Sequence, residues 1–220
     1  MTVELYFAPG ACSFVPHVGL EIVKAATGRE YTPKLVKLHK GEHLTPEYKA
    51  LNPDAQVPLL VVEGKPLTQI VAMCDWIDRT NPEAKLLPTD SWQRAEALSR
   101  LAWMNNTAHP TFTHVFMPQK FAEGEAAKAD VKSKAAGQYK KRLERLQAWA
   151  ANASPWMLGP QLSFHDAYAF TLLRWAGYAG IDPSGYPVLM KHVEKVMAAP
   201  PVAAVLERER IKLDTYKAAA

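Results

Sequence analysis

The apolar pattern of this 220-residue chain changes its period near residue 90. Before that point, four short segments have strand-like patterns: residues 3–8, 31–38, 59–62 and 65–67. Three further segments there have helical spacing: residues 14–27, 45–51 and 69–79. Beyond residue 90 the pattern is helical in every apolar segment: residues 91–107, 126–151, 163–178, 187–197 and 201–212. We therefore predict an α/β domain followed by an all-α domain.

The order of the elements in the first 80 residues restricts the sheet further. A crossover helix between the first two strands makes them parallel neighbours. The turn Glu63-Gly64 joins the last two strands as a hairpin. The order βαβ followed by ββα is the thioredoxin-like arrangement, a four-stranded mixed sheet with helices on its faces. We place this domain at residues 1–80, a proline-containing linker at 81–90 and the helical domain at 91–220.

Composition argues against several other classes of protein. Hydrophobic residues make up 48% of the chain and charged residues 22%, which is typical of a globular protein. There is no apolar run of about 18 residues and no secretory signal pattern, so we expect a cytoplasmic protein that does not partner a membrane. Two cysteines are too few for a disulfide framework, and we expect no metal. The net charge of +4 is dispersed, which favours an anionic small molecule over nucleic acid as partner.

Cys12 lies where the first strand, a Pro9-Gly10 turn and the first turn of a helix meet. A helix N-terminus carries roughly half a positive charge, which lowers the pKa of a thiol below its free value of about 8.5. We therefore expect Cys12 to be partly thiolate near neutral pH. The alternative is that Cys12 packs as a small apolar residue. Cys74 is expected on the outward or subunit-facing side of its helix, without a chemical role.

Several motifs in the first 80 residues resemble the N-terminal domain of the glutathione transferases. They are Pro9-Gly10, Cys12-Ser13, Pro16-His17, the Asn52-Pro53 turn, Val57-Pro58 and the Gln69 that precedes the closing helix. The Pro-Gly-x-Cys-Ser segment, followed by a Pro-His pair, is most similar to the bacterial beta class. The resemblance covers nearly the whole chain. It implies a homodimer, glutathione as co-substrate and a cleft between the two domains of each subunit.

The resemblance also implies how glutathione is held by the first domain. A cis peptide bond at Val57-Pro58 would let the Val57 backbone pair with the cysteinyl part of glutathione. The alternative is a trans proline at the start of an edge strand. Gln56 is expected to hydrogen-bond glutathione, and Lys40 or His39 to reach its glycyl carboxylate.

Gln69 and Ile70 depart from the family pattern at the γ-glutamyl end of glutathione. Related transferases usually have Glu or Gln followed by Ser, Thr or Gly at this point. Gln69 keeps an acceptor oxygen without a charge, which lowers the expected affinity about tenfold relative to Glu. Ile70 supplies no hydroxyl, but its backbone N–H at a helix N-terminus still suits a carboxylate.

The first helix of the second domain carries further candidates. His109 matches a histidine of beta-class enzymes, whereas Pro110 stands in place of their lysine, and Asn106 matches a glutathione-facing position. The alternative for His109 is packing at the end of a helix that Pro110 breaks. Four aromatic residues of the two domains are candidates for an apolar pocket that would hold an electrophilic second substrate. The alternative is that they pack in the core. They are Phe14, Trp103, Phe112 and Phe116.

Ser163 and Asp166 have the spacing of a capping box at the start of residues 163–178. Their expected role is structural. Transferases of this family carry a corresponding box, so the motif supports the fold and does not identify a substrate.

Two functions remain open from the sequence. In the first, the chain is a glutathione transferase with a role in detoxification, in which Cys12 supports conjugation to an apolar electrophile or thiol-disulfide exchange. Ser13 is then a second hydrogen-bond donor and His109 a further catalytic candidate. In the alternative, the chain keeps the fold as an interaction or carrier protein with weak or no glutathione catalysis, because of the changes at Gln69 and Ile70.

Overall fold

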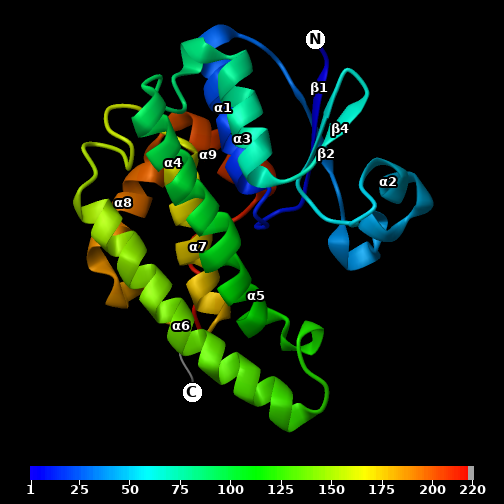
Figure 1. Cartoon of the computed structure of the whole chain (residues 1–220), viewed down its shortest axis with the longest axis vertical. Coiled ribbons are helices and arrows are strands. Elements are labelled where there is room, and N and C mark those ends of the chain that lie inside the picture. Colours follow the sequence, from blue (N-terminus) through cyan, green and yellow to red (C-terminus); the bar gives the residue numbers. More distant parts are fainter. Residues whose placement is uncertain (218–220) are drawn as a thin grey trace.

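A computed structural model describes residues 1–217, and its first part is built on a four-stranded sheet (Figure 1). The strands are β1 (Val3–Phe7), β2 (Thr32–Leu35), β3 (Leu59–Val62) and β4 (Lys65–Leu67). They lie in the order β2-β1-β3-β4. β1 pairs in parallel with β2, and β3 is antiparallel to both β1 and β4. The thioredoxin-like mixed sheet predicted from the element order is confirmed.

Two helices cover one face of this sheet and a third lies at the other (Figure 1). α1 (Phe14–Thr27) and α3 (Ile70–Thr80) pack on the face that Leu5, Phe7 and Leu60 present. α2 (Pro46–Leu51) lies at the opposite face, where Tyr48 packs against Leu59. The alternation of side chains along a strand explains this division, because successive residues point to opposite faces.

β2 is shorter than the predicted strand at residues 31–38. After Leu35 the chain turns into two short 3₁₀ turns, Leu38–Lys40 and Glu42–Leu44, joined by Gly41 at φ 72°. This left-handed conformation suits glycine because it has no Cβ. The turn brings Leu38 and His43 to the same edge as the loop after β1.

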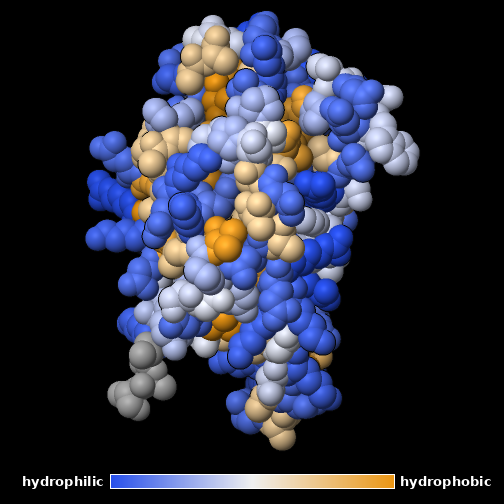
Figure 2. Space-filling model, turned by 90° about the vertical axis from the view of Figure 1, so that its left-hand side faces the viewer, coloured by the Kyte–Doolittle hydropathy of each residue, from blue (hydrophilic) through white to orange (hydrophobic). Residues whose placement is uncertain are grey.

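The second part of the chain is helical (Figure 1). Its helices are α4 (Ser91–Trp103), α5 (His109–Phe116), α6 (Glu125–Ala151), α7 (Phe164–Tyr178), α8 (Pro187–Ala198) and α9 (Pro200–Glu209). α7 lies at the centre, and nearly all of its residues are buried. Figure 2 shows an outer face that is mostly hydrophilic, with apolar residues in small separate groups. No helix within residues 1–217 is long and apolar enough to cross a membrane.

The predicted helix at residues 91–107 differs from the structure. After α4 the chain makes one π-helical turn, Met104–Ala108, and continues directly into α5. Pro110, which we expected to break the helix, lies in the first turn of α5. A π-helical turn is wider than an α-helical turn, so residues after Trp103 face other directions than regular α-helical spacing predicts.

The two domains share one apolar core, which fixes how they sit together. α1 packs closely against α7 at Gly19, where a Cβ would lie 2.1 Å from the Phe164 ring. Phe14 is buried in this interface, with its ring 4.7 Å from that of Phe170. Cys74 is fully buried in the same core, so its predicted position on the outward or subunit-facing side of the helix is wrong.

The predicted capping box at the start of α7 is confirmed and buried. Asp166 Oδ2 accepts from the Ser163 N–H and hydroxyl, each at 2.9 Å. Asp166 Oδ1 accepts from Met157 N–H at 3.0 Å and from His192 Nε2–H at 2.9 Å. One carboxylate therefore connects the start of α7 to the preceding loop and to α8.

Candidate active site

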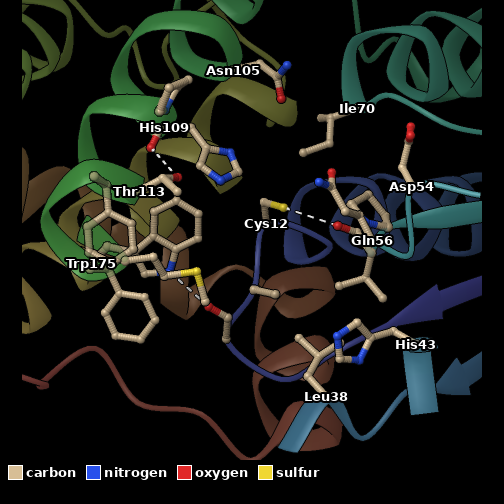
Figure 3. A pocket seen from close by; sticks show the side chains of 18 of the residues that line it. Cys12, Leu38, His43, Asp54, Gln56, Ile70, Asn105, His109, Thr113 and Trp175 are labelled. Atoms are coloured by element: carbon tan, nitrogen blue, oxygen red, sulfur yellow. Dashed lines mark hydrogen bonds between the residues drawn. The ribbon is translucent and has the colours of Figure 1, made fainter. Parts of the chain in front are cut away.

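A cavity of about 660 Å³ lies between the two domains, with Cys12 in its wall (Figure 3). This volume is typical of a site for a small molecule. The first domain contributes the loop after β1, the segment before β3 and the start of α3. The helical domain contributes α5, the turn that follows it and the C-terminal end of α7.

Cys12 lies in the turn immediately before α1, and its Sγ faces the backbone of Val57. The Cys12 thiol donates to Val57 O at 3.6 Å (Figure 3). The peptide bond between Val57 and Pro58 is cis, as the resemblance implied.

The protonation state of Cys12 differs from the prediction. Burial raises the pKa of the Cys12 thiol to about 12, and the negative charge of Glu209 acts in the same direction. The N–H groups of Cys12 and Ser13 lower the pKa by less than burial raises it. The expectation of a partial thiolate near neutral pH is therefore wrong, because loss of solvent outweighs the helix N-terminus.

The loop that carries Cys12 is held by the helical domain. Gly10 N–H donates to Glu209 Oε2 at 3.0 Å, and Gly10 O accepts from Trp175 Nε1–H at 2.9 Å. The other oxygen of Glu209 lies 2.7 Å from His17 Nδ1, and both side chains are buried. The N–H and the C=O of Gly10 are thus both bonded to residues that lie at least 165 positions further along the chain. Sequence patterns gave no sign of these contacts, because α7 and α9 show only core-like spacing.

Ser13 lies outside the cavity, contrary to its predicted role as a second donor. Its hydroxyl is buried, donates to Ala8 O at 3.2 Å and accepts from Ala8 N–H at 3.1 Å. The side chain therefore ties the end of β1 to the start of α1. A serine that precedes a helix often folds back in this way.

Most of the residues predicted to bind glutathione line the cavity. They are Cys12, Gln56, Val57, Pro58, Gln69 and Ile70. Gln69 has a φ of 70° and directly precedes α3, and Gln69 and Ile70 both line the cavity, so the start of α3 lies at its edge.

Lys40 and His39 do not line the cavity. Both are exposed in the first 3₁₀ turn after β2. Leu38 and His43 occupy this edge instead (Figure 3). His43 Nδ1 is buried and has no hydrogen-bond partner within residues 1–217. His43 was not predicted, because we expected the strand to run to residue 38, whereas β2 ends at Leu35.

The helical side of the cavity is aromatic. Phe112 and Phe116 line it as predicted, and the Phe112 ring stacks on that of Trp175 at 4.6 Å. Trp103 lies elsewhere, with its ring 5.0 Å from Trp149. Phe14 is also absent from the cavity wall, since it packs in the domain interface.

Asn105 lines the cavity in place of the predicted Asn106, which is exposed. The π-helical turn at Met104–Ala108 explains this shift of one residue. Asn105 Oδ1 accepts from the Tyr168 hydroxyl at 3.2 Å.

His109 faces the cavity opposite Cys12 (Figure 3). Its Nδ1 lies 3.0 Å from the Tyr168 hydroxyl, and its ring packs 4.8 Å from that of Trp175. Burial lowers the pKa of His109 to about 4, so the imidazole is neutral at physiological pH. His109 can therefore accept or donate a hydrogen bond there but does not supply a positive charge.

These residues give the cavity two chemically different sides. The first domain supplies a thiol, backbone hydrogen-bonding groups and the start of a helix, which suit an extended peptide with charged ends. The helical domain supplies aromatic rings, which suit an apolar molecule. Within residues 1–217, no three His, Cys, Asp or Glu side chains are grouped to hold a metal ion.

Comparison with known proteins gives consistent matches. Residues 1–79 match the family model "Glutathione S-transferase, N-terminal domain", and residues 104–200 match "Glutathione S-transferase, C-terminal domain". The chain is 31% identical to glutathione S-transferase GST-4.5 of Xanthomonas campestris pv. campestris, over 94% of this chain and 98% of that protein. It is 30% identical to GstA of Escherichia coli O157:H7, over 95% of this chain and 100% of that protein.

Solved structures agree with this assignment. A glutathione transferase homologue from Sulfitobacter, crystallised with bound glutathione, superposes with a TM-score of 0.86 at 26% identity, over 96% of this chain and 99% of that chain. The bacterial beta-class enzyme of Sphingomonas chungbukensis superposes with a TM-score of 0.79 at 29% identity, over 94% and 98%. The cavity therefore lies in a known fold, and the chain belongs to the glutathione S-transferase family.

Proposed function

We propose that this protein binds glutathione along the first-domain side of the cavity and joins it, through its sulfur, to a small apolar electrophile held by the aromatic side. The observation that carries this proposal is the Cys12 thiol, which lies 3.6 Å from Val57 O in a cavity that is also lined by Phe112, Phe116 and Trp175. A peptide thiol paired with the Val57 backbone would place its sulfur next to Cys12.

The high pKa of Cys12 favours a role as hydrogen-bond donor. At neutral pH the group is a thiol, because burial raises its pKa to about 12. When the glutathione backbone pairs with Val57, the Cys12 S–H is free to donate to the glutathione sulfur and stabilise its thiolate. That thiolate attacks the electrophilic carbon, a C–S bond forms, and a leaving group such as chloride departs with its electron pair. Thiol-disulfide exchange through Cys12 needs the Cys12 thiolate and is correspondingly less favoured.

The two ends of glutathione would be held by different elements. The γ-glutamyl carboxylate fits the N–H groups at the start of α3, with Gln69 as a neutral acceptor for the ammonium group. The glycyl carboxylate fits the edge at His43, whose buried Nδ1 has no partner within residues 1–217. We propose His43 for this contact in place of Lys40.

Binding and chemistry can be tested separately. Isothermal titration calorimetry with glutathione tests binding, and turnover of 1-chloro-2,4-dinitrobenzene and of hydroxyethyl disulfide tests the two reactions. We expect Cys12→Ser, which keeps a hydrogen-bond donor, to retain more conjugation than Cys12→Ala. Both variants should lose disulfide reduction if that reaction passes through Cys12. Equal conjugation by the wild type and Cys12→Ala would contradict the role of Cys12 as donor.

The same titration distinguishes the alternative of an interaction or carrier protein. That alternative predicts no heat of binding at millimolar glutathione and no retention on immobilised glutathione. Gln69→Glu is the matched variant: if only the missing charge weakens binding, this change should tighten binding of glutathione about tenfold.

We also propose that the protein is a homodimer. Trp92, at the start of α4, is 72% exposed, which is unusual for a large apolar side chain. Size-exclusion chromatography with light scattering should give twice the mass of one chain. Trp92→Glu tests whether this face contributes, because a buried charge there would shift the protein toward the monomer.

A further inference from the structure

We propose that Arg174 selects electrophiles that carry an anionic group, such as a carboxylate, on an aromatic body. This inference rests on the proposed conjugation reaction and names the class of its second substrate. Arg174 belongs to α7 and lines the cavity beside Trp175 and Tyr178.

The Arg174 side chain is fixed by two neutral contacts. Its Nε donates to Lys212 O at 2.7 Å, and its Nη2 donates to the Tyr178 hydroxyl at 2.9 Å. The guanidinium carbon lies 5.2 Å from the centre of the Tyr178 ring. These contacts hold the guanidinium plane in one orientation without neutralising its charge.

The third nitrogen, Nη1, lies against the loop that carries Cys12. A Cβ at Gly10 would come within 2.7 Å of Nη1, so glycine allows this approach. Nη1 has no hydrogen-bond partner within residues 1–217. Gly10, Cys12 and Arg174 line the same cavity, so a group bound at Nη1 shares that cavity with the thiol.

Arg174 is only 8% exposed, yet no carboxylate oxygen within residues 1–217 lies within 4.0 Å of it. Buried charges in proteins are normally paired, because an isolated charge loses its hydration. The nearby carboxylate of Glu209 is bonded to Gly10 and His17 instead. By contrast Arg94, whose side chain is 15% exposed, is paired with two aspartates. Arg174 thus has the environment of a group that receives its anion from a ligand.

The aromatic side chains around Arg174 indicate what the uncharged part of the ligand is. Phe112 and Trp175 stack at 4.6 Å, and Phe116 and Tyr178, about half exposed, continue this aromatic surface to the mouth of the cavity. A flat aromatic ring fits against these side chains, and a carboxylate on that ring can accept charge-assisted hydrogen bonds from Nη1, the nitrogen that the protein leaves unpartnered within residues 1–217. The predicted substrate class is therefore an activated aromatic acid.

Two matched probes test this inference: 4-chloro-3-nitrobenzoate and 4-chloro-3-nitrobenzamide. In both, the glutathione thiolate attacks the carbon that bears chlorine, the C–S bond forms and chloride leaves. Each kcat/KM is divided by the uncatalysed rate constant, which removes the difference in intrinsic reactivity. We expect the wild type to prefer the benzoate about tenfold. Arg174→Gln should bring this ratio to about one, mainly through the KM of the benzoate, and Arg174→Lys should restore part of it.

Lys120 provides the matched control, because it also lines the cavity but is exposed. Lys120→Gln should keep the preference for the benzoate. Loss of the preference in Lys120→Gln, its persistence in Arg174→Gln, or its absence in the wild type would overturn the inference. So would an Arg174→Gln variant that weakens glutathione binding and leaves the ratio unchanged, since Arg174 would then hold the tripeptide.

A binding measurement keeps this test independent of turnover. Quenching of tryptophan fluorescence by 4-nitrobenzoate and 4-nitrobenzamide reports on the cavity through Trp175. We expect tighter binding of the benzoate by the wild type and equal binding of the two by Arg174→Gln. If neither chloro compound is conjugated, the proposed function fails. Equal binding of the two nitro compounds by the wild type would refute the role of Arg174, whatever the outcome for conjugation.

Discussion

The pKa of Cys12 leads to a quantitative prediction about its reactivity. At pH 7.5, a thiol with a pKa of about 12 is thiolate in about one molecule in 30,000, whereas a thiol of pKa near 9 is thiolate in about one in 30. The more basic thiolate is about twentyfold more nucleophilic over this interval. We therefore expect iodoacetamide to alkylate Cys12 about 50-fold more slowly than a free cysteine peptide. The rate should rise about tenfold per pH unit up to at least pH 10.

Peptide mass spectrometry after timed alkylation measures this rate at Cys12 and Cys74 separately. Cys74 is the internal control, because it is fully buried and burial raises its pKa well above the ordinary value. Cys12→Ser confirms which peptide carries the label. A plateau in the rate of Cys12 alkylation below pH 8.5 would refute the reasoning, since the helix N-terminus would then outweigh desolvation.

Three further predictions concern stability and the Cys12 loop. The pKa of His109 is about 4 in the folded chain against 6.5 unfolded, so the stability that its neutral form contributes is present above pH 6.5 and is lost as pH falls toward 4. Urea titrations should show a loss of about 3 kcal/mol over this window that is absent in His109→Gln. Trp175→Phe removes the hydrogen bond to Gly10 O and should raise the KM for glutathione about fivefold, and the urea midpoint should fall as well, because the buried indole also packs on Phe112. Ser163→Ala should lower the free energy of unfolding by about 1 kcal/mol. Asp166→Asn should lower it by about 3–5 kcal/mol, because four donors face that buried carboxylate. Equal losses in the two variants would contradict the central role given to the Asp166 carboxylate.

The fold was largely predictable because its signals are local. The hairpin β3–β4 follows from two apolar runs around Glu63-Gly64, and the end of α1 follows from Gly28, whose left-handed conformation ends the helix. Strand and helix periods need only a few neighbouring residues to be recognised. The predictions failed at β2 and at the π-helical turn after α4. In both places the backbone lies next to the cavity and leaves the regular strand or α-helical geometry on which a periodic apolar pattern depends.

The candidate site was predictable in part. Cys12, Val57 and Pro58 were found because they belong to short motifs with fixed spacing, and the structure brings them to one cavity. Asn106 was misplaced because one π-helical turn rotates that part of the helix, and Trp103, which precedes this turn, packs against Trp149 instead of the cavity. Arg174, Trp175 and Glu209 were missed entirely.

The sequence by itself determined the order of the elements, the two-domain division of strand and helix, and the position of the cysteine between β1 and α1. Only the tertiary structure decided the chemical state of that cysteine and the contacts of its loop. Burial depends on every segment that packs around a group, and those segments, α7 and α9, come from the other end of the chain. A local pattern reports the helix N-terminus that lowers the pKa of Cys12, whereas the larger effect of desolvation arises only when the two domains pack together.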